Sequence, residues 1–254
     1  MCETCGCSAH GKDTETIEVL GRLLDANDRT AAHNREHFDS RRVVAFNIMS
    51  SPGAGKTALL EATIEALKPE FRMAVIEGDL ETDNDARRIR AHGVAAVQIT
   101  TGSACHLDAR MVHDALHDLA LSQLDVVFIE NVGNLVCPAS FDLGQHRNIV
   151  LLSATEGDDK PAKYPVMFRA ADLVLLTKMD LAAVLDDFEP RRAEKAVRDL
   201  ANAAPVIPLS ARKQLNFDAW VAWLRGEIAN IRAGQPAHSA NEVRHEHHHH
   251  PAVA

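Results

Sequence analysis

The chain has 254 residues, of which 46% are hydrophobic, and a formal net charge of -9 at pH 7. This length suits one substantial domain with appendages, because one buried core of that size is more common than two. The acidic balance argues against nucleic-acid binding, and apolar runs such as Val43 to Met49 and Leu173 to Leu176 are too short to cross a membrane.

The chain begins with a thiol-rich segment, residues 1–12. It carries thiols and polar residues where a secretory signal peptide needs an apolar stretch, so we expect a cytoplasmic protein with reduced thiols. Cys2, Cys5 and Cys7 form the pattern C-x-x-C-G-C, in which Gly6 lets the third sulfur fold back toward the first two. Three thiolates and one nitrogen suit Ni(II) in a planar site or Zn(II) in a tetrahedral one. We therefore predict a flexible metal-binding segment.

Residues 13–40 are predicted to be a helical lead-in that packs on the main domain or on a partner. The helical pattern over residues 15–38 places four apolar side chains on one stripe: Ile17, Leu20, Leu23 and Leu24. From residue 41 to residue 233, helical patterns alternate with the apolar runs VVAFNIM, MAVIE, AAVQI, DVVFIE, NIVLLS, DLVLLT and PVIPL. Buried strands spaced by helices are typical of a mostly parallel sheet, so we predict one α/β domain, flanked by helices.

A glycine-rich turn, SSPGAGKT, follows the first predicted strand and opens a helix, which is the setting of a P-loop. Backbone N–H groups of such a loop cradle phosphates, and Lys56 would neutralise their charge. Ser50 stands where the usual pattern has its first glycine. The predicted phosphate-binding residues are Gly53, Ala54, Gly55, Lys56, Thr57 and Ala58.

Two carboxylates stand at the ends of later strands, where ligands of open α/β sheets collect. Asp79 ends MAVIEGD, and Glu130 ends DVVFIE. Because Mg²⁺ takes one or two carboxylates along with phosphate oxygens, we predict a Mg²⁺ shell of Thr57, Asp79 and Glu130, direct or through water. The predicted catalytic residues are Lys56, which stabilises phosphate charge, and Asp79 and Glu130, either of which orients the attacking water.

Base recognition is predicted later in the chain, where Thr177-Lys178-Met179-Asp180 resembles the NKxD signature of GTPases. Asp180 would accept two hydrogen bonds that guanine offers and adenine does not, while the Lys178 stem covers the ring. Thr177 replaces the usual asparagine. Ser210-Ala211 matches the loop whose backbone N–H approaches the guanine oxygen, so we predict binding of GTP and GDP.

A second metal site is predicted inside the domain. Cys105 and His106 follow AAVQI, and Cys137 lies seven residues after Glu130, in the loop where a GTPase switch would be. A lone cysteine is more often a small buried hydrophobe, but a Cys-His pair and a cysteine at corresponding strand ends favour a site for Ni(II) or Zn(II).

Residues 234–254 are predicted to be a disordered, histidine-rich tail, either a native metal-collecting tail or part of an added tag. Its histidines are His238, His245 and His247 to His250. Most of the remaining histidines are predicted to be ordinary surface or helix residues; these are His33, His37, His92, His113, His117 and His146.

The leader C-x-x-C-G-C, the loop SSPGAGKT, the Cys-His pair and the segments ENVGNLVCP and EGDDKPAKYP together closely resemble the HypB family, the hydrogenase nickel-incorporation GTPases of the SIMIBI class. The resemblance covers essentially the whole chain apart from the tail. It implies a GTPase that helps to place nickel in a [NiFe] hydrogenase, with a zinc-containing partner of the HypA type and the hydrogenase large subunit as client. It also implies a tight nickel site at Cys2, Cys5 and Cys7 and a weaker one at Cys105, His106 and Cys137.

The resemblance further implies a homodimer with GTP bound. In that dimer Cys105 and His106 of both chains would share one metal, and hydrolysis would relax residues 130–137 and release it. Lys160 and Lys163 either reach the partner's nucleotide or form a solvated basic pair. Two alternatives remain open: a urease-accessory GTPase, which typically has Cys-Pro-His at its metal site, and a metal-storage protein with a vestigial GTPase domain.

Overall fold

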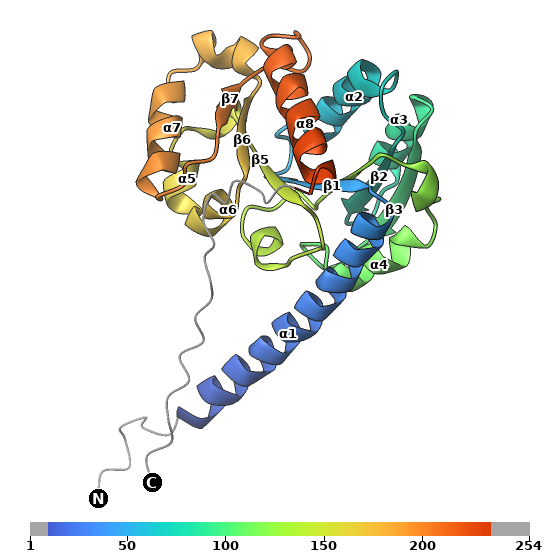
Figure 1. Ribbon diagram of the computed structural model, residues 1–254. Coiled ribbons are helices and arrows are strands. Elements are labelled where there is room, and N and C mark those ends of the chain that lie inside the picture. The colour runs from blue at the N-terminus through green and yellow to red at the C-terminus, as the bar shows by residue number, and fades with distance from the viewer. Residues whose placement is uncertain (1–9, 235–254) are drawn as a thin grey trace, which may run out of the picture.

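The structure is a computed structural model that describes residues 10–234, with side chains described from residue 21 onward. Seven parallel strands form one sheet in the order β3-β2-β4-β1-β5-β6-β7, with helices on both faces (Figure 1). The strands are β1 (Val44–Ser50), β2 (Met73–Asp79), β3 (Ala95–Thr100), β4 (Val126–Glu130), β5 (Arg147–Ser153), β6 (Leu173–Thr177) and β7 (Val206–Pro208). The helices are α1 (His10–Ser40), α2 (Lys56–Leu67), α3 (Asn84–Ala91), α4 (Ala109–Leu116), α5 (Lys160–Lys163), α6 (Pro165–Arg169), α7 (Pro190–Asp199) and α8 (Phe217–Arg232). The predicted parallel α/β fold is confirmed.

The alternation of side chains along each strand supplies a core on both faces of the sheet. On one face, Phe46 and Phe128 pack with residues of α2, α3 and α8, including the fully buried Trp220. Trp220 donates its indole N–H to the Thr63 hydroxyl at 2.8 Å, so its one polar atom is satisfied. The opposite face is covered by the C-terminal end of α1 with α4 and, farther along the sheet, by α6 and α7.

The strand order gathers the functional loops at one edge of the sheet. β1 lies between β4 and β5, and β2 lies on the far side of β4. In parallel register, Ile48 of β1 and Glu77 of β2 both lie beside Glu130 at the carboxyl end of β4. The loops after β1, β2 and β4 therefore meet at one place, where ligands of open α/β sheets bind.

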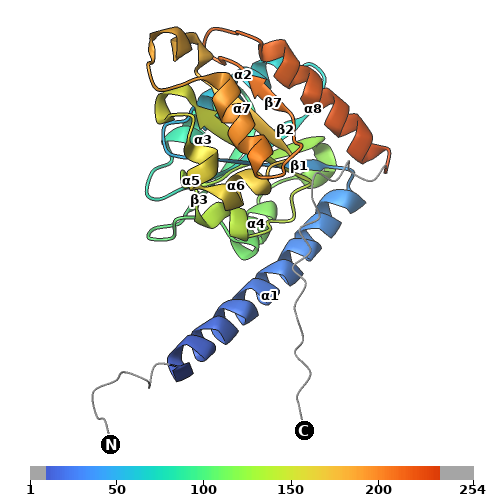
Figure 2. The same cartoon turned by 90° about the vertical axis from the view of Figure 1, so that its left-hand side faces the viewer.

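Helix α1 is longer than the predicted lead-in, and its N-terminal half projects away from the domain (Figures 1 and 2). Its buried face is spaced at helical intervals and consists of Asn27, Ala31, Asn34 and Phe38. Leu23, a member of the predicted stripe, is 61% exposed, so the domain does not cover it. Ile17 and Leu20 lie outside the described side chains. The face of α1 that packs on the domain therefore contains two asparagines and is not purely apolar.

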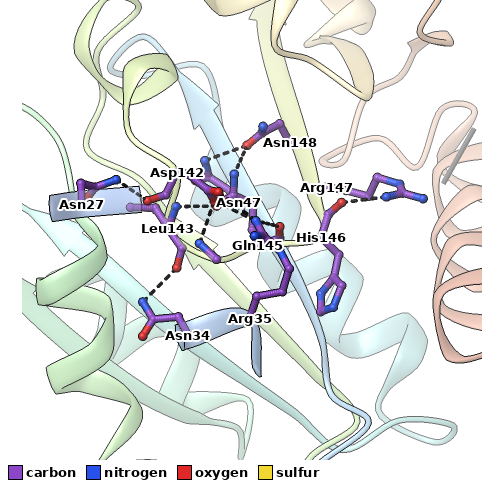
Figure 3. A network of polar contacts seen from close by, with 11 residues as sticks. Asn27, Asn34, Arg35, Asn47, Asp142, Leu143, Gln145, His146, Arg147 and Asn148 are labelled. Carbon is purple, nitrogen blue, oxygen red and sulfur yellow. Dashed lines mark hydrogen bonds and ion pairs between the residues drawn. The ribbon is translucent and has the colours of Figure 1, made fainter. Parts of the chain in front are cut away.

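Polar contacts join α1 to the loop that precedes β5 (Figure 3). Asn27 donates to the Asp142 carbonyl at 2.8 Å, and Asn34 donates to the Leu143 carbonyl at 3.1 Å. The Arg35 guanidinium contacts both carboxylate oxygens of Asp142, at 2.9 and 3.0 Å. Because buried polar groups cost free energy unless they are bonded, these contacts fix the position of the helix.

Gly144 makes the close approach of α1 possible. Its φ of +89° lies in the left-handed region, and a Cβ there would lie 2.6 Å from the Ala31 carbonyl oxygen and from Asn34 Cβ. A side chain at this position would therefore have to displace α1.

Among the helices of residues 10–234, none combines the length and apolar character needed to cross a membrane.

We expect Gly144→Ala to lower the free energy of unfolding by about 2–3 kcal/mol. The new methyl group would clash with α1, and alanine is strained at this positive φ. The matched control is Gly93→Ala, where φ is +79° and a Cβ would meet no atom within 4 Å. That variant carries only the backbone strain, about 1–2 kcal/mol. Chemical denaturation of both variants measures the difference, and equal losses would contradict the packing role of Gly144.

Candidate nucleotide and metal sites

The loop between β1 and α2 has the backbone of a phosphate cradle. Gly53 and Gly55 have φ values of +75° and +97°, which side chains rarely adopt, and Gly55 caps the N-terminus of α2. Lys56 is 8% exposed and donates to the Ser50 hydroxyl at 3.2 Å. Ser50, the departure from the usual glycine, thus holds the lysine that would meet phosphate. The dipole of α2 and the lysine together favour an anion at this place.

A cavity of about 400 Å³ opens over this loop and extends to the ends of β2 and β4. The predicted residues that line it are Gly53, Gly55, Lys56, Thr57, Ala58, Asp79 and Glu130. Residues that the sequence did not single out also line it, among them Glu77, Asp85 and Arg88. The Arg88 guanidinium is paired with Glu61 at 2.7 Å and with Asp85 at 2.9 Å.

The three predicted Mg²⁺ ligands lie in this cavity. Thr57 donates its hydroxyl hydrogen to Glu130 Oε1 at 3.0 Å, which joins residues 73 positions apart. Asp79 accepts from the Thr82 hydroxyl at 2.6 Å and from the Leu80 N–H at 2.8 Å. Although burial acts to raise it, these hydrogen bonds hold the pKa of Asp79 below its usual range, so this carboxylate is ionised at neutral pH.

Glu77 adds a carboxyl group that the sequence analysis did not predict. It lies two residues before Asp79 and directly beside Glu130 across the strands, and it is 2% exposed. Burial, and then the Glu130 charge, raise the pKa of Glu77; burial also raises the pKa of Glu130, which Lys56 opposes. The one signal in the sequence was an acidic residue at the end of the buried run MAVIE.

Two buried carboxylate oxygens in this group, Glu77 Oε1 and Glu130 Oε2, have no hydrogen-bond partner. Unsatisfied buried acceptors beside a threonine hydroxyl fit a hard divalent cation, which prefers oxygen ligands. The residues present therefore suit Mg²⁺, with Thr57 and Glu130 nearest to one another and Asp79 on the cavity wall.

The predicted base-recognition residues lie beyond β5, outside the cavity. Thr177 donates to the Ala54 carbonyl at 2.8 Å, which ties this loop to the phosphate loop. The Met179 N–H donates to the Leu209 carbonyl at 3.1 Å, so the loop of Lys178 and Asp180 lies beside that of Ser210 and Ala211. Threonine in place of asparagine thus keeps a contact between the two loops.

The structure brings together Cys105, His106 and Cys137. The two sulfur atoms are 3.1 Å apart, Cys105 Sγ is 3.8 Å from His106 Nδ1, and the ligand atoms of all three lie within 4.8 Å of one another. The Phe141 ring stacks on His106 with centroids 4.0 Å apart. Two thiols and an imidazole are a ligand set for Ni(II) or Zn(II), and three ligands leave a fourth position for a group from elsewhere. Cys2, Cys5 and Cys7 lie outside the described residues.

Protonation of this cluster depends on its surroundings. The adjacent Cys105 thiol and burial raise the pKa of Cys137, so it stays protonated until a metal displaces the proton. Burial lowers the pKa of His106, which favours the neutral ring that binds metals.

The segment from Glu130 to Cys137 connects the cavity to this cluster. The Asn134 N–H donates to the Ser50 carbonyl at 2.8 Å, and its side-chain amide donates to the Cys105 carbonyl at 3.2 Å. A Cβ on Gly133 would lie 2.9 Å from the Pro52 backbone, so the segment passes directly over the phosphate loop. One stretch of chain therefore contacts the residues proposed for phosphate and those proposed for the soft metal.

The family model of the CobW/HypB/UreG nucleotide-binding domain matches residues 44–208. Hydrogenase maturation factor HypB of Escherichia coli (strain K12) is 49% identical over 208 residues, which cover 82% of this chain and 71% of that protein. The hydrogenase/urease maturation factor HypB of Helicobacter hepaticus is 52% identical over 171 residues, 66% of this chain and 70% of that protein. The crystal structure of HypB from Helicobacter pylori in complex with nickel has a TM-score of 0.78 and 41% identity, covering 84% of this chain and 99% of the other.

The buried pair of Glu77 and Glu130 predicts a pH dependence of stability in protein free of metal and nucleotide. A carboxyl whose pKa is raised above its ordinary value of 4.5 stabilises the fold below that pH, and this contribution is lost as the pH rises toward the folded-state pKa. Glu77→Gln cannot ionise, so we expect its unfolding free energy to exceed the wild-type value by about 1–3 kcal/mol at pH 8, with little difference at pH 4.5.

Denaturation of wild type, Glu77→Gln and the exposed control Glu81→Gln, with a chelator present, measures this difference. Parallel pH profiles for wild type and Glu77→Gln would contradict the burial of an ionisable pair.

Proposed function

The chain belongs to the HypB family of hydrogenase maturation factors, and on that basis we propose that it is a GTPase that delivers Ni(II) during maturation of a [NiFe] hydrogenase. The observation that carries the proposal is the segment from Glu130 to Cys137, which contacts Thr57 at one end and Cys105 at the other. A chain that only hydrolysed GTP would not need thiols at the end of this segment. A chain that only stored metal would not need the Glu130 end of this segment to lie in a phosphate site.

In the proposed reaction, the phosphate loop holds GTP and Lys56 stabilises the charge of the transferred phosphoryl group. When bound, Mg²⁺ supplies electrostatic stabilisation of the β- and γ-phosphate oxygens, and Thr57, Asp79 and Glu130 are the residues that would hold it. Asp79, which is ionised, also suits the role of orienting the attacking water. Asp180 would select guanine through two charged hydrogen bonds. The Ser210 N–H already donates to the Leu215 carbonyl at 2.9 Å, so the backbone N–H of Ala211 is the one proposed to approach the guanine oxygen.

Cys105, His106 and Cys137 are proposed to bind Ni(II) as cargo, in line with the nickel complex of the Helicobacter pylori relative. Three ligands in one chain leave the coordination shell open to a group from a second chain, which supports a homodimer when GTP is bound. Loss of the γ-phosphate would relax the segment of residues 130–137 and lower the affinity for nickel. A zinc-containing partner of the HypA type and the hydrogenase large subunit would then take part in the transfer.

A urease is a second candidate client, because the Helicobacter hepaticus relative is named a hydrogenase/urease maturation factor. The same nickel-binding residues could supply nickel to a hydrogenase or to a urease. Adjacent Cys105 and His106, in place of the Cys-Pro-His typical of dedicated urease-accessory GTPases, favour the hydrogenase.

We expect Lys56→Ala to lower the kcat/KM for GTP by about 10²-fold or more, because the residue neutralises charge that develops on the phosphates. Binding of Ni(II) by the cysteine sites should persist. The matched control is Lys68→Ala, at the exposed end of the same helix, which should leave hydrolysis unchanged. A wild-type chain without guanine-specific hydrolysis would instead support the storage alternative.

Nickel affinity is expected to differ between the GDP state and the state with a non-hydrolysable GTP analogue by about 5–150-fold, the usual range of coupling between two sites. The measurement is best made in a Cys2→Ser/Cys5→Ser/Cys7→Ser background, which removes the proposed N-terminal site. Adding Cys105→Ala should abolish the difference. Equal nickel affinities in the two nucleotide states would contradict the proposal that GTP hydrolysis triggers the release of nickel.

A further inference from the structure

Four histidines gather where α1 packs on α4, away from the sites described above. His33 and His37 lie one turn apart on α1, and His113 of α4 lies one turn before His117, the residue that caps the C-terminus of α4. Side chains at positions i and i+4 share one face of a helix, and two histidines at that spacing are a common way to hold a metal ion. The sequence analysis predicted all four to be ordinary helix or surface residues.

The rings of the two pairs face one another. His33 Nε2 and His37 Nε2 are 3.1 Å apart, and His113 Nε2 lies 3.3 Å from His117 Nε2. The centroid of the His113 ring is 5.2 Å from that of His33 and 5.6 Å from that of His37. Ligand nitrogens of His33, His37 and His113 all lie within 4.8 Å of one another, so one ion can reach the three.

A buried asparagine fixes the tautomer of His113. Asn34 is fully buried, and its amide nitrogen donates to the Ala109 carbonyl at 2.8 Å. It also donates to the Leu143 carbonyl at 3.1 Å (Figure 3). Its Oδ1 must therefore accept, and it lies 3.0 Å from His113 Nδ1, so that nitrogen carries the proton. The Nε2 of His113 therefore carries the lone pair of the ring and accepts from His117 Nε2 at 3.3 Å, a contact that a metal ion would replace. A carbonyl behind the distal ring nitrogen is the usual support of a metal-binding histidine.

The two histidines of α1 are oriented by charged neighbours. Arg41 donates to His37 Nδ1 at 3.2 Å, which leaves the His37 proton on Nε2, directed at the Nε2 of His33. His33 then carries its own proton on Nδ1, 3.6 Å from the Glu36 carboxylate. Binding of a metal ion at His37 Nε2 would require the proton of that nitrogen to move to Nδ1, in place of the contact with Arg41. Arg41 also donates to the His37 carbonyl and is exposed, so it can release the ring without loss of the helix end.

We propose that His33, His37 and His113, with His117 as an adjoining fourth ligand, form a site for a divalent ion of the imidazole-binding class, such as Zn(II) or Ni(II). This site shares no residue with the cluster of Cys105, His106 and Cys137. Imidazoles alone suit these ions and do not suit Mg²⁺ or Ca²⁺.

Occupation of this site would clamp α1 to α4. In the sequence, α1 begins three residues after Cys7, and α4 begins three residues after His106. An ion held between them would join the two helices that lie next to the two cysteine-containing regions. The site would thus hold α1 against the domain when metal is plentiful.

The test is hydrogen–deuterium exchange of the full chain, carrying Cys105→Ser, with and without ZnCl₂ or NiCl₂. We expect metal to slow exchange of the amides of residues 27–40 and 109–117 by about tenfold or more, because a ligand that binds only the docked state stabilises it. His33→Gln should abolish the slowing. The His33 side chain is 55% exposed and makes none of the buried contacts of Asn34, so this variant keeps the fold.

The matched control is His92→Gln, a histidine at the end of α3 paired with Glu61 and Glu65. It should retain the full slowing, and His113→Gln, checked for folding by GDP binding, should lose it as His33→Gln does. Metal-induced slowing that is the same in His33→Gln as in the parent, or no slowing in the parent, would overturn the proposal.

Discussion

The hydrogen bond from Thr57 to Glu130 joins the first turn of α2 to the end of β4, and the rest of the molecule is arranged around the segment that begins there. Glu130 is followed by Asn131, whose Oδ1 accepts from the Leu107 N–H at 3.1 Å, and by Asn134, which bonds to Ser50 and Cys105. The loops after β1, β3 and β4 are therefore fixed to one another by polar contacts, of which that of Asn131 is buried. A shift at the phosphate loop cannot leave the thiols in place unless these contacts break.

Several local features of this region lower the stability of the fold. Two carboxyl groups, Glu77 and Glu130, are buried side by side with an unsatisfied oxygen each, and Gly53 and Gly55 hold left-handed backbone. A protein selected only for stability would replace such a pair with apolar residues. Buried acceptors without partners are expected where a cation and a charged ligand complete the site. The large apolar cores on both faces of the sheet compensate for this cost.

The parallel α/β fold could be predicted from the sequence because each strand is a short apolar run bounded by helical patterns. That signal depends only on residues that are neighbours in the sequence. The sequence was also sufficient to predict that Cys105 and Cys137 are close, since both follow the carboxyl ends of parallel strands. It missed Glu77, because one acidic residue inside a buried run does not reveal what lies across the strand. The sequence analysis also missed the packing face of α1, where Asn27 and Asn34 are buried. A polar residue is expected to be exposed unless its hydrogen-bond partners are known. Here the partners lie in the loop before β5, far away in the sequence.

Asn134 bonds to Ser50 of the phosphate loop and to Cys105 of the thiol cluster, so the proposed coupling between nucleotide and soft metal is expected to pass through it. The most direct test is a titration of a non-hydrolysable GTP analogue with and without Ni(II), in wild type and in Asn134→Ala. Linkage requires that nickel change the nucleotide affinity by the same factor by which nucleotide changes the nickel affinity. We expect a clear nickel effect in wild type and a factor near one in Asn134→Ala, with nucleotide still bound. An equal nickel effect in both proteins, or none in wild type, would contradict the account.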